Sequence, residues 1–136
     1  MSYSLREHTA DVAVEATGPS LDAVFGAVAD GLAAAMCEAV PSGGERFSVT
    51  VRAESRESLL FDYLDALIYE RDVRSVLPVD NEATIHEADG EWVCAASARG
   101  VPLSAVTARE VKAVTYSEMD LSATDDGWHA YVVFDV

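Results

Sequence analysis

Residues 8–16, His-Thr-Ala-Asp-Val-Ala-Val-Glu-Ala, indicate how the front of the fold is built. After Asp11 every even-numbered position is apolar, and this two-residue period predicts a half-buried strand over residues 9–16. The Asp11 carboxylate must face solvent, accept hydrogen bonds or bind a cation, because burying an unpaired charge is costly. His8 adds a second group suited to metal ligation or proton transfer. A solvated strand end is the alternative that these residues alone leave open.

Two later segments space their apolar side chains three and four residues apart, as amphipathic helices do. The first covers residues 21–36, and Ser20 is placed to cap its N-terminus. The second follows Ser55, another N-capping residue, and extends to about Arg74. Its apolar face predicts a core helix, and its other face carries charged residues that include Arg71.

In the rest of the chain, apolar and polar residues alternate as they do in antiparallel strands. Residues 84–87 and 92–96 flank an Asp-Gly pair, the strongest short-range signal for a hairpin. Residues 100–103 break the pattern and begin an irregular connection. The other predicted strands are residues 46–53, 111–116, 119–122 and 128–136. The sum is one α+β domain over residues 1–136, with two helices packed on one face of a mostly antiparallel sheet of about seven strands.

Charge is the outstanding bulk property of the chain. It has 24 acidic and 9 basic residues, a formal net charge of −15 and a pI of about 4.3. The acidic residues are spread along the chain, which is typical of a surface adapted to high salt and predicts a halophilic source. No cluster of basic residues is present, so direct binding of nucleic acid is not expected. Lys112 is the only lysine, a flexible point charge suited to reaching a carboxylate site or a partner.

Other features of the sequence indicate the cellular compartment of the protein. No apolar run approaches the ~18 residues of a membrane span, and the first residues lack the apolar segment of a signal peptide. Cys37 and Cys94 lie far apart without metal-type spacing, as expected for buried thiols in a reducing compartment. We therefore expect a soluble, cytoplasmic protein without a membrane partner.

The end of the chain offers a candidate site. The last predicted strand is strongly apolar and closes with Asp135 and Val136, so that one carboxylate side chain and the α-carboxylate lie one residue apart. If this strand pairs with residues 9–16, Asp11 supplies a third oxygen donor. Such a set suits Ca²⁺, Mg²⁺ or Mn²⁺ better than zinc. One Ca²⁺ requires the two aspartate carboxylates to lie within roughly 8 Å of each other, given its ~2.3–2.6 Å bonds.

Three separated motifs resemble the archease family. They are His-Thr-Ala-Asp-Val at residues 8–12, Lys-Ala-Val-Thr-Tyr at 112–116 and Val-Phe-Asp-Val at 133–136. The order of elements, the length and the Leu-, Asp- and Tyr-rich helix at residues 61–69 agree as well. The family often continues the second motif with a histidine, where this chain has Ser117. If that histidine has a role in activation, this protein performs the role otherwise or does without it.

The resemblance implies a function and a site. Archeases are small α+β proteins that are not ligases themselves but assist the RNA ligase RtcB, which joins the exons of split tRNAs. They promote its guanylylation and multiple turnover, and the family has also been linked to chaperone-like protection of a tRNA methyltransferase. They bind a divalent metal, typically Ca²⁺, through residues that correspond to Asp11, Asp135 and Val136.

The resemblance also implies roles for neighbouring residues, and the residues themselves leave rival functions open. Lys112, Thr115 and His8 are then expected to support the metal ligands or to face the partner. Two rivals stay open: a metal-dependent hydrolase with His8 as general base, and a general chaperone of RNA-modifying enzymes that needs no ion.

Overall fold

The computed structural model describes residues 2–8 and 11–136, which form seven strands, two α-helices and one short 3₁₀ helix. The elements in chain order are β1 (Ser2–His8), β2 (Asp11–Gly18), α1 (Leu21–Met36), β3 (Glu45–Ala53), α2 (Arg56–Arg74), β4 (Val76–Ala88), β5 (Glu91–Pro102), the 3₁₀ helix (Leu103–Ala105), β6 (Ala113–Thr124) and β7 (Gly127–Asp135). Neither α-helix in this part of the chain is long and apolar enough to cross a membrane.

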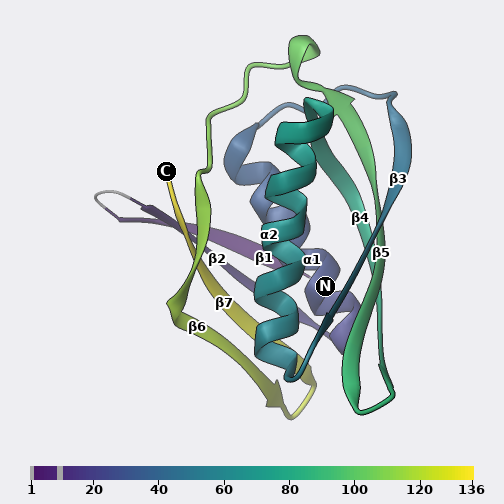
Figure 1. Ribbon diagram of the computed structural model, residues 1–136. Helices are drawn as coiled ribbons and strands as arrows, with labels where there is room; N and C mark the ends of the chain where they lie inside the picture. The colour runs from purple at the N-terminus through teal and green to yellow at the C-terminus, as the bar shows by residue number, and fades with distance from the viewer. Residues whose placement is uncertain (1, 9–10) are drawn as a thin grey trace.

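The strands form two antiparallel sheets with both helices between them (Figure 1). The first sheet has the order β1-β2-β7-β6, and the second has the order β3-β5-β4. Helix α1 packs against β2 and β4, and α2 packs against β3 and β6, so each helix touches both sheets. The α+β class and the predicted numbers of helices and strands are confirmed, whereas the prediction of a single sheet is wrong.

The burial of α1 explains the second sheet. Eleven of its 16 residues are buried, including alanines and glycines outside the predicted apolar face. A helix that is apolar around most of its circumference must be covered on more than one side. One sheet cannot cover it, and the strands therefore divide between two.

Local signals placed the helices and one turn correctly. The Ser20 hydroxyl accepts a hydrogen bond from the Ala23 amide at 3.1 Å, and Ser55 caps α2 in the same way. The turn between β4 and β5 has positive φ at Asp89 (55°) and Gly90 (81°), the conformation that an Asp-Gly hairpin needs. These features depend only on neighbouring residues.

The strand predictions need three corrections. Strand β1 was not predicted, and β5 continues through residues 100–102 before the irregular connection begins. Residues 113–124 form the single strand β6, which contains a bulge between Thr115 and Asp120. In this bulge residues 116–119 lie opposite Val132 alone, so the alternation of apolar and polar residues is interrupted there. The interruption is why the sequence predicted two strands. The predicted strand over residues 9–16 is β2 from Asp11 onward, and Thr9 and Ala10 lie outside the described residues.

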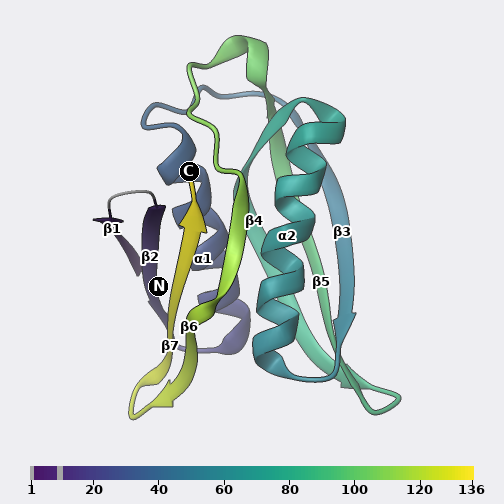
Figure 2. The same cartoon turned by 60° about the vertical axis from the view of Figure 1, so that its left-hand side comes forward.

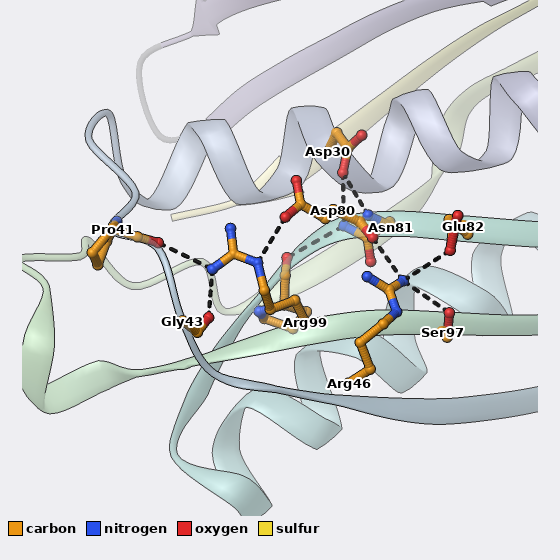
Figure 3. Close-up of polar contacts among 10 residues, drawn as sticks. Asp30, Pro41, Gly43, Arg46, Asp80, Asn81, Glu82, Ser97 and Arg99 are labelled. Carbon is orange, nitrogen blue, oxygen red and sulfur yellow. Dashed lines mark hydrogen bonds and ion pairs between the residues drawn. The ribbon is translucent and has the colours of Figure 1, made fainter.

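A bulge in β4 ties the second sheet to α1 (Figure 3). Asp80 has a φ of 49°, and the side chain of Asp30 on α1 accepts two 3.0 Å hydrogen bonds from Asn81, one from its backbone and one from its amide. Arg99 on β5 pairs with Asp80 at 2.7 Å, and Arg46 on β3 donates to the Asp80 carbonyl at 2.9 Å. Arg99 also donates to the carbonyls of Pro41 and Gly43, so the two arginines link the bulge to β3 and to the loop before it.

Residues 103–112 cross from the second sheet to the first and pass both helix ends (Figure 2). The Arg109 amide donates to the Met36 carbonyl at the end of α1 at 2.7 Å. Arg71 of α2 donates to the Val111 carbonyl at 2.6 Å and is only 6% exposed. The sequence placed Arg71 on the polar face of its helix, which is wrong because the crossover covers it. The crossover then delivers the chain to the start of β6.

Candidate metal centre

The pairing of β2 with β7 places Asp11 directly opposite Asp135. Paired residues of antiparallel strands have Cα atoms about 4.5–5.5 Å apart and side chains on the same sheet face. The predicted neighbourhood of the first and last strands is thereby confirmed. The separation of roughly 8 Å or less between the two carboxylates, which one Ca²⁺ requires, stays a prediction. Val136 follows Asp135 immediately and is half-buried.

Asp11 carries the most informative atom of this pair. Its Oδ1 is buried and has no hydrogen-bond partner among the described residues. A buried anionic oxygen without a donor is unfavourable, and a cation is one group that would satisfy it. Asp135 is exposed, so the pair opens to solvent on one side. The two carboxylates, with a main-chain oxygen of Val136, suit a hard divalent cation.

The other predicted residues lie around this pair. The Lys112 amide donates to the Asp135 carbonyl at 2.8 Å, and the Lys112 side chain is exposed. The Thr115 hydroxyl donates to the Val133 carbonyl at 3.1 Å, so it stabilises the contact between β6 and β7. His8 ends β1 with its Cα paired to that of Asp11, but its side chain lies outside the described part of the structure.

Residues 2–8 and 11–136 contain no group of three or more His, Cys, Asp and Glu side chains arranged to hold a metal. The set predicted here has only two such side chains, because its third donor is a main-chain group.

The crossover contacts of Arg71 and Arg109 were missed by sequence reasoning. The local sequence around Arg71 carries no signal of a partner 40 residues away, and that around Arg109 carries none of a partner at Met36.

A second polar cluster lies on the first sheet. His129 of β7 contacts Glu15 of β2 at 3.0 Å and Asp120 of β6 at 3.2 Å. The hydrogen bond to Glu15 is the main cause that raises the pKa of His129 above its ordinary value, Asp120 adds to it, and partial burial opposes it. The protonated ring can donate to both carboxylates and so links three strands.

Fold and site together define a class: a small α+β protein with two sheets around two helices and a carboxylate pair where the first sheet's inner strands end. The model of the Archease protein family (MTH1598/TM1083) matches residues 3–136. The chain belongs to the archease family.

Individual relatives match over nearly their whole length. The chain is 33% identical to the archease of Methanosarcina barkeri, with 98% of this chain and 95% of the relative covered. It is 32% identical to the archease of Archaeoglobus fulgidus, with all of both chains covered. The solution structure of Methanobacterium thermoautotrophicum protein 1598 is 28% identical, covers 98% of both chains and has a TM-score of 0.86.

A more distant structure shares the fold. The crystal structure of a Thermotoga maritima protein, described as an archease and possible chaperone, is 24% identical with a TM-score of 0.64. It covers 96% of this chain and 94% of its own. The arrangement of two sheets around two helices is therefore one that solved structures share.

Proposed function

We propose that this protein is a non-catalytic accessory factor that activates the RNA ligase RtcB, promoting its guanylylation and multiple turnover. In this proposal a divalent ion, Ca²⁺ first and Mg²⁺ or Mn²⁺ as alternatives, is held by Asp11, Asp135 and a main-chain oxygen of Val136. The observation that carries the proposal is the register of β2 with β7, which sets two carboxylates side by side and leaves Asp11 Oδ1 buried without a partner.

The chain's own residues would hold and present that site. Hydrogen bonding between β2 and β7 keeps the two carboxylates in register, and the Lys112 amide fixes the backbone of Asp135. A bound ion would neutralise the carboxylates and offer open coordination positions to an enzyme. Because Asp135 and the Lys112 side chain are exposed, a large partner can reach the site from solvent.

Charge favours contact with the enzyme over contact with RNA. The net charge is −15, and three arginines make contacts within the fold, of which Arg71 is buried and Arg46 is exposed. Arg46 and Arg99 hold the β4 bulge, and Arg71 holds the crossover. The acidic surface also fits a protein of a salt-rich cytoplasm, where screening removes most long-range steering.

A chaperone-like action on a tRNA-modifying enzyme, such as a tRNA methyltransferase, is the second candidate. Its support is the Thermotoga maritima relative in fold, which is described as a possible chaperone. This action would need no ion, so the two candidates differ in what happens when the carboxylate pair is disrupted.

The decisive experiment compares Asp11→Asn with Asp89→Asn. Both changes neutralise one carboxylate, and Asp89 lies exposed in the β4–β5 turn, where asparagine tolerates the positive φ. Guanylylation of RtcB is measured with each variant, and Ca²⁺ binding is measured by calorimetry. We expect Asp11→Asn to lose both and Asp89→Asn to keep both. Full stimulation by Asp11→Asn would contradict the role of the ion, and hydrolysis of small phosphoesters by the isolated protein would contradict the non-catalytic role.

A further inference from the structure

The outward side of α2 carries the most exposed large apolar side chains of the described residues. Tyr69 is 62% exposed, and Val73, one turn further along the helix, is 61% exposed. The third is Tyr116 on β6, which is 49% exposed and whose ring centroid lies 5.5 Å from that of Phe61 on α2. In Figure 1 this side of α2 is turned to the viewer, between β6 and β3. These apolar groups therefore follow the helix for roughly 18 Å, from Phe61 to Val73.

Acidic residues alternate with the apolar groups along the same side. Asp62 and Asp65 are exposed and lie within the two turns before Tyr69. Positions spaced three and four residues apart are neighbours on a helix surface, so these side chains form one stripe. Within the described part of the chain, neither carboxylate has an ion-pair or hydrogen-bond partner. We call the stripe and the ring beside it the α2 face, which consists of Phe61, Asp62, Asp65, Tyr69, Val73 and Tyr116.

The three arginines of α2 do not balance these charges. The Arg56 guanidinium lies 5.1 Å from the centroid of the Trp128 ring. That of Arg74 lies 4.6 Å from the centroid of the Phe47 ring, on the side of the helix that packs against β3. Arg71 is buried beneath the crossover. Each cation of the helix is therefore engaged by another element, and the two carboxylates are left to the solvent or to a partner.

Two further exposed bases lie near the C-terminal end of α2. They are Arg109 and Lys112 on the crossover, which Arg71 holds through the Val111 carbonyl. Arg71 is six positions beyond Asp65 in the sequence, which is about 9 Å along the helix axis. The acidic part of the α2 face is therefore separated from these two bases.

Charge and apolarity together select the kind of partner. RNA is polyanionic and would be repelled by the two carboxylates. A second copy of the chain would bring the same carboxylates and a net charge of −15. A protein segment that presents apolar side chains between basic ones complements both parts of the face. An enzyme that binds RNA carries basic surface for its phosphates, and an RNA ligase is therefore a partner of the right chemistry.

The α2 face lies beside the candidate metal centre. Asp135 is on β7, β6 is the next strand and the edge of its sheet, and α2 packs against β6 (Figure 2). Tyr116 is three positions along β6 from Ala113, the residue paired with Asp135, which is roughly 10 Å. One partner surface of ordinary size can cover both places. Resting on the proposed function, we propose that the α2 face docks the RNA ligase through a basic, amphipathic segment of that enzyme.

The test changes the charge and the ring of the α2 face separately. Asp65→Lys reverses one charge, and its control Glu87→Lys makes the same change of net charge on the exposed part of β4. Tyr69→Ala removes an exposed ring at a position where alanine favours the helix. Its control Tyr3→Ala removes the same ring from β1, at the opposite edge of the first sheet.

Binding of RtcB is measured by calorimetry, and its guanylylation is followed as the concentration of each variant is raised. We expect Asp65→Lys and Tyr69→Ala each to weaken RtcB binding about tenfold, as residues central to an interface do. The concentration that gives half-maximal guanylylation should rise by the same factor, and saturating amounts should restore the full response. The two controls should behave like the unchanged protein, and all four variants should keep Ca²⁺ binding and a folded melting transition.

The outcomes separate the docking face from the role of the metal centre. Unchanged RtcB binding by both Asp65→Lys and Tyr69→Ala would overturn the docking face. So would a concentration-dependent dimer that Tyr69→Ala dissociates, because the occupant would then be a second copy. If the unchanged protein did not stimulate RtcB, the proposed function would fail and this proposal with it. Stimulation that Asp11→Asn loses, and that both face variants keep at the same half-maximal concentration, would refute the docking face alone.

Discussion

Replacing Asp11 by asparagine should stabilise the ion-free protein. Asp11 Oδ1 is buried without a hydrogen-bond donor, and Asp135 lies directly opposite on β7. An unsatisfied buried polar group costs about 1–3 kcal/mol, and more when it is charged. Asparagine keeps the shape and removes the charge, so we expect it to recover about 1 kcal/mol of that cost. For a domain of this size, such a gain corresponds to a rise in melting temperature of about 4 °C.

A divalent ion should reverse the order of stability of the unchanged protein and Asp11→Asn. At an ion concentration of 100 times its dissociation constant, binding stabilises the folded state by about 2.7 kcal/mol. The unchanged protein gains this stability, and Asp11→Asn, which has lost a ligand, does not. The unchanged protein should therefore melt below the variant in EDTA and above it in excess Ca²⁺.

Thermal unfolding of both proteins in EDTA and in CaCl₂ tests this reasoning. Asp89→Asn is the control and should shift by less than about 0.5 kcal/mol in either condition, as exposed substitutions usually do. A marked loss of stability of Asp11→Asn in EDTA would show that the carboxylate is already satisfied within the fold. A melting temperature of the unchanged protein that ignores Ca²⁺, Mg²⁺ and Mn²⁺ would refute the site itself.

Three further outcomes follow from buried or paired groups. Arg71→Met should cost about 1–3 kcal/mol in urea unfolding, because the Val111 carbonyl loses its 2.6 Å donor; a loss below that range would mean that another donor replaces it. The hydrogen bond to Glu15 raises the pKa of His129, so its stabilising contribution is complete below the ordinary value of 6.5 and disappears as the pH rises through the raised pKa. Stability curves between pH 6 and 9 should therefore be flatter for His129→Gln, and identical curves would contradict the contact. Burial raises the pKa of Cys94 to about 12, so this fully buried thiol should react with iodoacetamide at pH 8 only after unfolding, as mass spectrometry of native and denatured protein can check.

The sequence named all three residues of the candidate site, Asp11, Asp135 and Val136, but it could join them only on the condition that the first and last strands pair. Asp11 and Asp135 could be named because a charge inside an apolar alternating segment needs an explanation. Their meeting depends on β2 pairing with β7, 124 positions apart in the chain, and no local pattern specifies which strands pair.

The errors in the strands have a common physical cause. The alternation of apolar and polar residues indicates which face of a strand is buried. This pattern is interrupted where a strand bulges, as β6 does between Thr115 and Asp120. Strand β1 lies at the edge of its sheet, where Tyr3 and Leu5 are 43% and 42% exposed and the apolar pattern is therefore weak. Edge and bulge positions are decided by neighbours that the local sequence does not contain.

By itself, the sequence determined what depends on adjacent residues: the two helices with their serine caps, the turn at Asp89 and Gly90, the acidic surface and the family. Only the tertiary structure decided that two sheets enclose the helices, that Arg71 is buried beneath the crossover, and that Asp11 faces Asp135. Caps and turns form between groups a few residues apart, whereas sheet order and side-chain burial follow from packing the whole chain around one core.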